Sequence, residues 1–114
     1  MKRKDLRYHH IGIPTTQPMV GEEYLAEYKF YHCGYKNSEF GIEWMRYEAG
    51  SPLPELVQRI PHVAFQVDDV YEAIRGRHVI IEPNSPSAGV LVAFIEENGA
   101  PIELIQESEP AASD

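Results

Sequence analysis

Two short motifs that each occur twice place the strongest constraint on how this 114-residue chain can fold. A histidine begins an apolar segment at His10 and again at His62, 52 positions later. A glutamate follows an isoleucine at Glu43 and again at Glu103, 60 positions later. The chain therefore reads as one unit used twice, over residues of about 8–50 and about 60–107, with the first unit shorter by 8 residues.

The hydrophobic pattern predicts a single α+β domain made mostly of short strands. Asn98-Gly99 is a strong hairpin signal and predicts a turn between the last two strands. One substantial helix is expected after Asp68 or Asp69, ending near Ile74. Residues 22–35 are ambiguous, and their aromatic residues favour a strand. The predicted strands are residues 8–13, 22–35, 41–47, 62–67, 78–82, 90–96 and 101–106.

The repeated histidines and glutamates share a face of the predicted sheet. Side chains alternate along a strand, so His62 faces away from the core when Phe65 faces into it. The same alternation turns His10, Glu43 and Glu103 away from the core. Two imidazoles and two carboxylates can hold one divalent ion, and mixed nitrogen and oxygen ligands suit zinc, nickel, cobalt, manganese or iron(II). These four residues are the predicted metal ligands.

Each predicted ligand has an alternative interpretation. The rival of His10 is its neighbour His9, and the alternation selects His10. Glu43 could be an exposed strand carboxylate like others nearby, and His62 with Glu103 could be a surface pair. His32, His78 and Cys33 have only structural or solvent interpretations.

Three segments carry a resemblance to a known family: HHIGI at residues 9–13, PHVAFQVDD at 61–69 and VAFIEENGAPIELI at 92–105. From residue 8 to 106 the chain resembles the glyoxalase, or vicinal oxygen chelate, superfamily, and is most similar to its glyoxalase I and methylmalonyl-CoA epimerase branches. The resemblance implies paired βαβββ modules whose sheets curl around a metal. Each module then gives one ligand from its first strand and one from its last, which are again His10, Glu43, His62 and Glu103. Residues 14–21 are too short and too broken by proline for the first module's helix, so we expect that helix to be missing or nearly so.

The resemblance further implies a metal-dependent lyase or isomerase that stabilises an enediolate or enolate of a small oxo, hydroxy or thioester substrate. It suggests Glu103 as the base, with Glu43 as the alternative. A second hypothesis is a non-catalytic small-molecule-binding or resistance protein on the same fold. A third is an iron(II) dioxygenase that uses His10, His62 and Glu103 as its metal-binding triad.

Composition narrows the class of protein further. A net charge of -8 argues against a nucleic-acid partner, which needs a basic surface. No apolar stretch approaches the length of a membrane span, and the basic residues 1–4 are not followed by the apolar run of a signal peptide. Cys33 is the only cysteine, so no intrachain disulfide can form. These features favour the cytoplasm.

Two expectations concern the surface and the end of the chain. A missing first helix would leave apolar sheet surface uncovered, and such patches usually mark an interface, so we expect a homodimer. The acidic, small-residue-rich residues 107–114 are expected to form a disordered tail.

Overall fold

The computed structural model describes residues 5–108, which form one mixed sheet of eight strands with three short helical segments. The strands are β1 (Arg7–Pro14), β2 (Glu23–Leu25), β3 (Phe30–Cys33), β4 (Ile42–Tyr47), β5 (His62–Gln66), β6 (His78–Ser87), β7 (Val90–Glu97) and β8 (Ala100–Glu107). The helical segments are the 3₁₀-helix η1 (Tyr35–Asn37) and the α-helices α1 (Glu55–Arg59) and α2 (Val70–Ala73). The sheet curls, and the predicted α+β class with a curved mixed sheet is confirmed.

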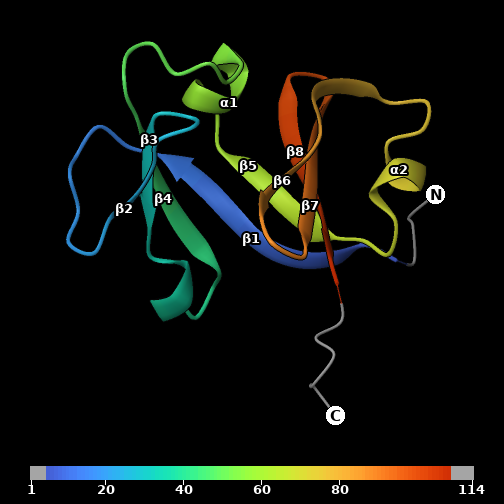
Figure 1. Ribbon diagram of the computed structural model, residues 1–114, viewed down its shortest axis with the longest axis horizontal. Coiled ribbons are helices and arrows are strands. Elements are labelled where there is room, and N and C mark those ends of the chain that lie inside the picture. Colours follow the sequence, from blue (N-terminus) through green and yellow to red (C-terminus); the bar gives the residue numbers. More distant parts are fainter. Residues whose placement is uncertain (1–4, 109–114) are drawn as a thin grey trace.

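The order of the strands repeats within the sheet. From edge to edge it is β2-β3-β4-β1-β5-β8-β7-β6, so each half has the same arrangement read from the centre outwards. β1 and β5 pair antiparallel across the middle, with β4 parallel to β1 and β8 parallel to β5. Strands β2 to β4 lie on one side of this central pair and β6 to β8 on the other (Figure 1). The seam between β1 and β5 therefore brings the two repeated motifs side by side.

One face of the second half carries the main hydrophobic core. Side chains of β7 and β8 pack there against α2, in a cluster of Val67, Val70, Ala73, Ala93, Ile95 and Leu104. The Asp69 carboxylate caps α2 by accepting the backbone N–H of Glu72, as the sequence predicted. The prediction of one substantial helix is wrong, because α2 spans only four residues. Gly76, with φ of 75°, ends the turn that follows.

The segment predicted as one strand over residues 22–35 is a hairpin. β2 and β3 pair antiparallel, and the chain reverses through Tyr28 and Lys29, whose N–H groups both donate to the Leu25 carbonyl. Lys29 has a φ of 57° there, a left-handed conformation that a non-glycine residue rarely adopts. Aromatic residues occur in both β2 and β3, so the alternating pattern runs through the turn and gives no sign that the chain reverses there.

Other boundaries also differ from expectation. No helix separates β1 from β2, as predicted for the first module. β6 continues to Ser87 through residues expected to form a loop. Glu107, placed in the predicted tail, is the last residue of β8, and the rest of that tail from residue 109 lies outside the described residues. Within residues 5–108, no helix is long and apolar enough to cross a membrane.

Candidate metal centre

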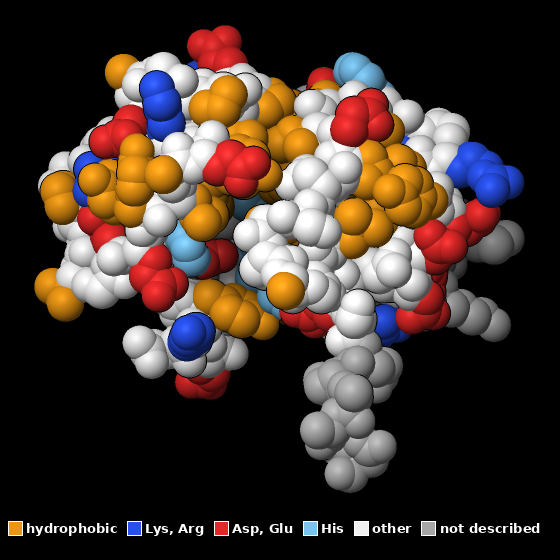
Figure 2. All heavy atoms as spheres, in the orientation of Figure 1, with side chains coloured by type: hydrophobic (Ala, Val, Ile, Leu, Met, Phe, Trp, Pro, Cys, Tyr) orange, Lys and Arg blue, Asp and Glu red, His pale blue; other side chains and the backbone are white. Residues whose placement is uncertain are grey.

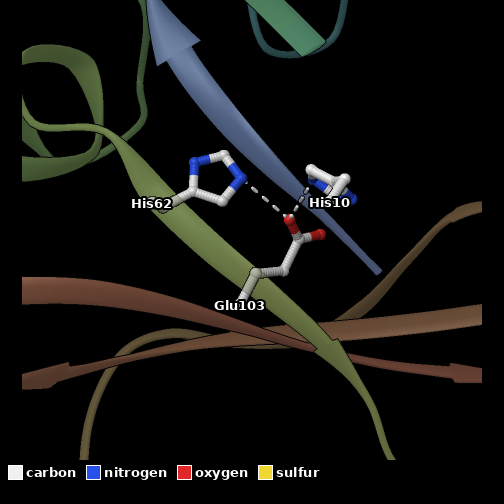
Figure 3. Close-up of side chains that lie close together, drawn as sticks. All are labelled: His10, His62 and Glu103. Carbon is white, nitrogen blue, oxygen red and sulfur yellow. Dashed lines mark ion pairs between the residues drawn. The ribbon is translucent and has the colours of Figure 1, made fainter. Parts of the chain in front are cut away.

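Three of the four predicted ligands converge on the concave side of the sheet. His10 comes from β1, His62 from β5 and Glu103 from β8, and one donor atom of each lies within 4.8 Å of the others (Figure 3). Nε2 of His62 lies 3.0 Å from Oε1 of Glu103, and Nε2 of His10 lies 3.3 Å from the same oxygen. His10 and His62 are only 6% and 2% exposed, so this face of the sheet is buried as well.

The seam places the histidines with small residues opposite them. In the antiparallel register, His62 pairs with Gly12 and His10 pairs with Ala64. The His62 ring lies directly over Gly12, where an added Cβ would be 2.7 Å from its Nε2 and 2.8 Å from its Nδ1. Ala64, which is fully buried, also pairs with Glu103 across the parallel β5–β8 ladder. Small side chains on the seam therefore leave room for the imidazoles.

The charge state of Glu103 follows from this crowding. Its side chain is 12% exposed. Burial raises the pKa of this carboxyl, but the imidazoles of His10 and His62 lower it by more, to about 2. Glu103 is therefore a carboxylate at neutral pH, as a metal ligand must be.

A buried nitrogen tests whether these residues fit a metal ion. Nε2 of His62 lies 3.0 Å from Oε1 of Glu103, but the angles do not form a hydrogen bond, and no other described residue supplies a partner. Leaving a buried polar atom unsatisfied costs about 1–3 kcal/mol. Nitrogen and oxygen ligands lie about 2.0–2.2 Å from zinc, and a tetrahedral ion therefore separates them by roughly 3.4 Å. The separations of 3.0 and 3.3 Å fit such an ion, which would also satisfy His62.

Glu43, the fourth predicted ligand, lies beside the group but is paired elsewhere. Its Oε1 is 4.0 Å from Nε2 of His10, while its Oε2 makes a 2.7 Å hydrogen bond with Nδ1 of His32 on β3. This bond to Glu43 raises the pKa of His32, against the opposing effect of burial. Glu43 is thus hydrogen-bonded to His32 and does not belong to the group of three candidate ligands.

His32 is a residue that the sequence analysis missed. It was interpreted as structural or solvent-exposed, because no local motif distinguishes it. The one available signal is its parity with Phe30, two residues earlier, which is buried in the same strand. That signal becomes informative only once β3 is known to pair with β4, where His32 lies opposite Met45.

His9, which the alternation excluded as a ligand in favour of His10, contacts the His10 ring. Its Nδ1 lies 2.8 Å from Nδ1 of His10, and its Nε2 lies 3.6 Å from Oε2 of Glu107. Its ring stacks on Tyr35, with centroids 5.0 Å apart and planes 3° from parallel. Glu107, His9 and His10 therefore form a continuous polar chain that leads to the candidate ligands.

A cavity of about 190 Å³ adjoins the centre. His10, His32, Glu43 and Glu103 form its polar end, and Tyr47 lies beside them. Burial raises the pKa of Tyr47, as do the nearby charges of Glu103 and Glu43, so its phenol stays protonated. The remaining wall is mainly apolar, with Leu25, Phe30, Met45, Val57, Val92 and Phe94 among its side chains. Figure 2 shows the molecule hollowed between its two halves, with hydrophobic and histidine side chains at the opening.

Comparison with known proteins identifies the fold. No protein-family model matches the chain, and no curated protein matches its sequence. A hypothetical protein from Bacillus halodurans is similar in structure, with a TM-score of 0.73 and 23% identity over 96% of this chain and 100% of that one. Methylmalonyl-CoA epimerase from Mycobacterium tuberculosis is similar with a TM-score of 0.67 and 20% identity, over 100% of this chain and 97% of that one.

These likenesses define the class of fold. The chain has a vicinal oxygen chelate-like fold, as the sequence motifs suggested. A His-His-Glu group that can hold a metal ion lies at its seam.

Proposed function

We propose that this protein is a metal-dependent isomerase or lyase acting on a small oxo or hydroxy compound. The observation that carries the proposal is the convergence of His10, His62 and Glu103 beside a cavity with mainly apolar walls. These three residues would hold one divalent ion. When bound, the ion supplies Lewis-acid stabilisation of negative charge on the substrate oxygens.

Side chains of the protein would carry out proton transfer and bind the substrate oxygen. Glu103 is engaged by two imidazoles, and its pKa of about 2 makes it a weak base. We therefore assign proton transfer to Glu43, which faces the cavity and is oriented by His32. Glu43 would take a proton from the carbon next to the carbonyl and return it after the electron pair has moved onto oxygen. The Tyr47 phenol, which also lines the cavity, can donate a hydrogen bond to a substrate oxygen.

The experiment begins with metal analysis of protein purified without chelator. One equivalent of a divalent metal is expected, and Glu103→Gln should abolish it. His78→Ala is the matched control, because His78 is an exposed histidine outside the centre whose side chain is 71% exposed. Absence of stoichiometric metal in the wild-type chain, after addition of zinc, cobalt, nickel, manganese or iron(II), would refute the proposal.

Proton transfer is tested separately by deuterium exchange. The metal-loaded protein in D₂O is mixed with short 2-oxo and 2-hydroxy acids, and loss of the proton next to the carbonyl is followed by NMR. Glu43→Gln should keep the metal and lose exchange by 10²-fold or more, in the range of general-base contributions of about 10²–10⁴. Exchange at the wild-type rate in this variant would remove Glu43 from the mechanism.

A second candidate function is supported by the position of Glu43. Because Glu43 is paired with His32, the converged group is two histidines and one carboxylate, the set that non-haem iron(II) oxygenases use. Oxygen consumption by the iron(II)-loaded protein with a catechol or a 2-oxo acid would favour this alternative, and its absence would favour the isomerase.

A further inference from the structure

Apart from the histidines, the charged side chains that line the cavity are negative. Glu43 and Glu103 line it, and among residues 5–108 no lysine or arginine lines it. The formal net charge of the whole chain is -8. An anionic group placed deep in this cavity would lose its hydration without gaining a cation, which is costly for a charged group. Only the end beside the candidate metal ligands can compensate a negative charge.

The far wall offers uncharged polar groups instead. Tyr28, in the β2–β3 turn, donates a 3.1 Å hydrogen bond from its hydroxyl to Oδ1 of Asn84 on β6. Nδ2 of Asn84 donates in turn to the Glu82 carbonyl, 2.8 Å away. The hydrogen bond between Tyr28 and Asn84 joins the first half of the chain to the second across the cavity. Tyr28 and Asn84 are satisfied by each other, so they do not form a site that awaits an anion.

The size of the cavity limits the part of an occupant that it can enclose. Its volume is about 190 Å³. It is smaller than the roughly 300–1,000 Å³ of pockets that bind drug-sized ligands. The enclosed part of an occupant is therefore small, and its contacts beyond the polar end are mainly with aliphatic and aromatic side chains.

We infer, on the basis of the proposed function, that the substrate is a short 2-oxo or 2-hydroxy acid with an uncharged aliphatic tail. Its single anionic end lies against the centre formed by His10, His62 and Glu103. Its tail lies among apolar side chains such as Met45 and Val92. Compounds with a carboxylate or phosphate in the tail are rejected, because the described residues of the wall include no cation to receive it.

Two matched probes test this inference. 4-Methyl-2-oxopentanoate and 2-oxopentanedioate have the same head and differ in whether the tail is aliphatic or charged. Calorimetry with the zinc-loaded protein should give a Kd at least tenfold lower for the aliphatic probe. Equal affinities, or tighter binding of the dicarboxylate, would overturn the inference.

A metal-free arm separates this inference from the proposed function. 3-Methylbutanamide and 4-amino-4-oxobutanoate are added to the metal-free chain, and NMR follows the methyl groups of Met45, Val57 and Val92. The neutral amide should shift these signals, and the charged one should not. This result decides the tail preference even if no metal binds, whereas failure to bind metal would count against the proposed function alone.

A variant that introduces a positive charge tests whether the preference arises in the cavity. Leu53 lines the cavity and is only partly buried, so Leu53→Lys can be accommodated while placing a cation at the wall. In zinc-loaded protein, Leu53→Lys should reduce the ratio of the Kd values of the two oxo acids to threefold or less. In metal-free protein, it should reduce the preference for the neutral amide over the charged amide to the same extent. Val20→Lys is the control, since Val20 is fully exposed and is not among the lining residues. An unchanged preference in folded Leu53→Lys would place the selectivity elsewhere and overturn the inference.

Discussion

The His62 imidazole lies directly over Gly12, close enough that any Cβ at this position would collide with the ring. The two residues are paired across the β1–β5 seam. Gly12 does not have the positive φ that often requires glycine, so its backbone would accept alanine without strain. Glycine is needed here for the space that the ring occupies.

Gly12→Ala is therefore expected to destabilise the fold and displace His62. Overpacking of this kind costs about 1–3 kcal/mol in the free energy of unfolding, measured by urea titration. Metal affinity should fall with it. In a double-mutant cycle, Gly12→Ala should cost much less when His62→Ala has already removed the ring. The same cost in both backgrounds would show that the contact is unimportant.

A second prediction concerns the support that His9 gives to His10. For Nε2 of His10 to bind a metal, its Nδ1 must carry the proton and donate to Nδ1 of His9, 2.8 Å away. The proton of His9 is then on Nε2, facing Glu107. His9→Phe keeps a ring that can stack on Tyr35 but removes this hydrogen bond, so zinc affinity should fall about 10–100-fold.

The tautomers themselves provide an independent readout. In zinc-loaded protein, nitrogen-15 NMR should show His9 protonated on Nε2 and His10 protonated on Nδ1. His78→Phe is the matched control for affinity and should bind zinc like the wild type. Wild-type affinity in His9→Phe, or a His9 protonated on Nδ1 in the zinc-loaded chain, would contradict the assigned hydrogen bond between the two histidines.

A third prediction follows from the raised pKa of His32. The hydrogen bond to Glu43 raises the folded-state pKa above its ordinary value of 6.5. A raised folded pKa stabilises the fold fully below pH 6.5, and this stabilisation is lost as the pH rises through the folded value. The free energy of unfolding of the metal-free chain should therefore contain a component that declines over that range. Glu43→Gln should remove it and lower the pKa of His32 observed by NMR, whereas an unchanged His32 titration would show that the pair does not form in solution.

A fourth prediction concerns thermal stability. Only the folded chain assembles His10, His62 and Glu103, so a bound ion stabilises it by mass action. Zinc at 100 times its Kd should add about 2.7 kcal/mol and raise Tm correspondingly. Glu103→Gln should show no such shift, because a neutral amide replaces the carboxylate ligand. A zinc-induced shift of wild-type size in this variant would place the ion elsewhere.

Strand alternation predicted the common face of the three converging residues, and the family resemblance supplied their grouping. His62 and Glu103 occupy β5 and β8, which pair with each other without a register shift. His10 lies at the register shift of β1, so its parity was predicted from Ile11 and Ile13, which follow the shift. The pairing of Glu43 with His32 was not predictable in this way, because it depends on the hairpin at Lys29 and on β3 lying beside β4. Such register is set by packing between segments distant in sequence.

The repeated strand order has a consequence for the two carboxylates. Glu43 and Glu103 occupy equivalent places in their halves, two residues before Met45 and Ile105. Met45 lies opposite His32 across its ladder, and Ile105 lies opposite Val92 across the corresponding one. Where the first half presents an imidazole, the second presents an isopropyl group. Equivalent glutamates of a repeated scaffold thus have different partners: Glu43 is hydrogen-bonded to His32, whereas Glu103 contacts the two histidines of the seam.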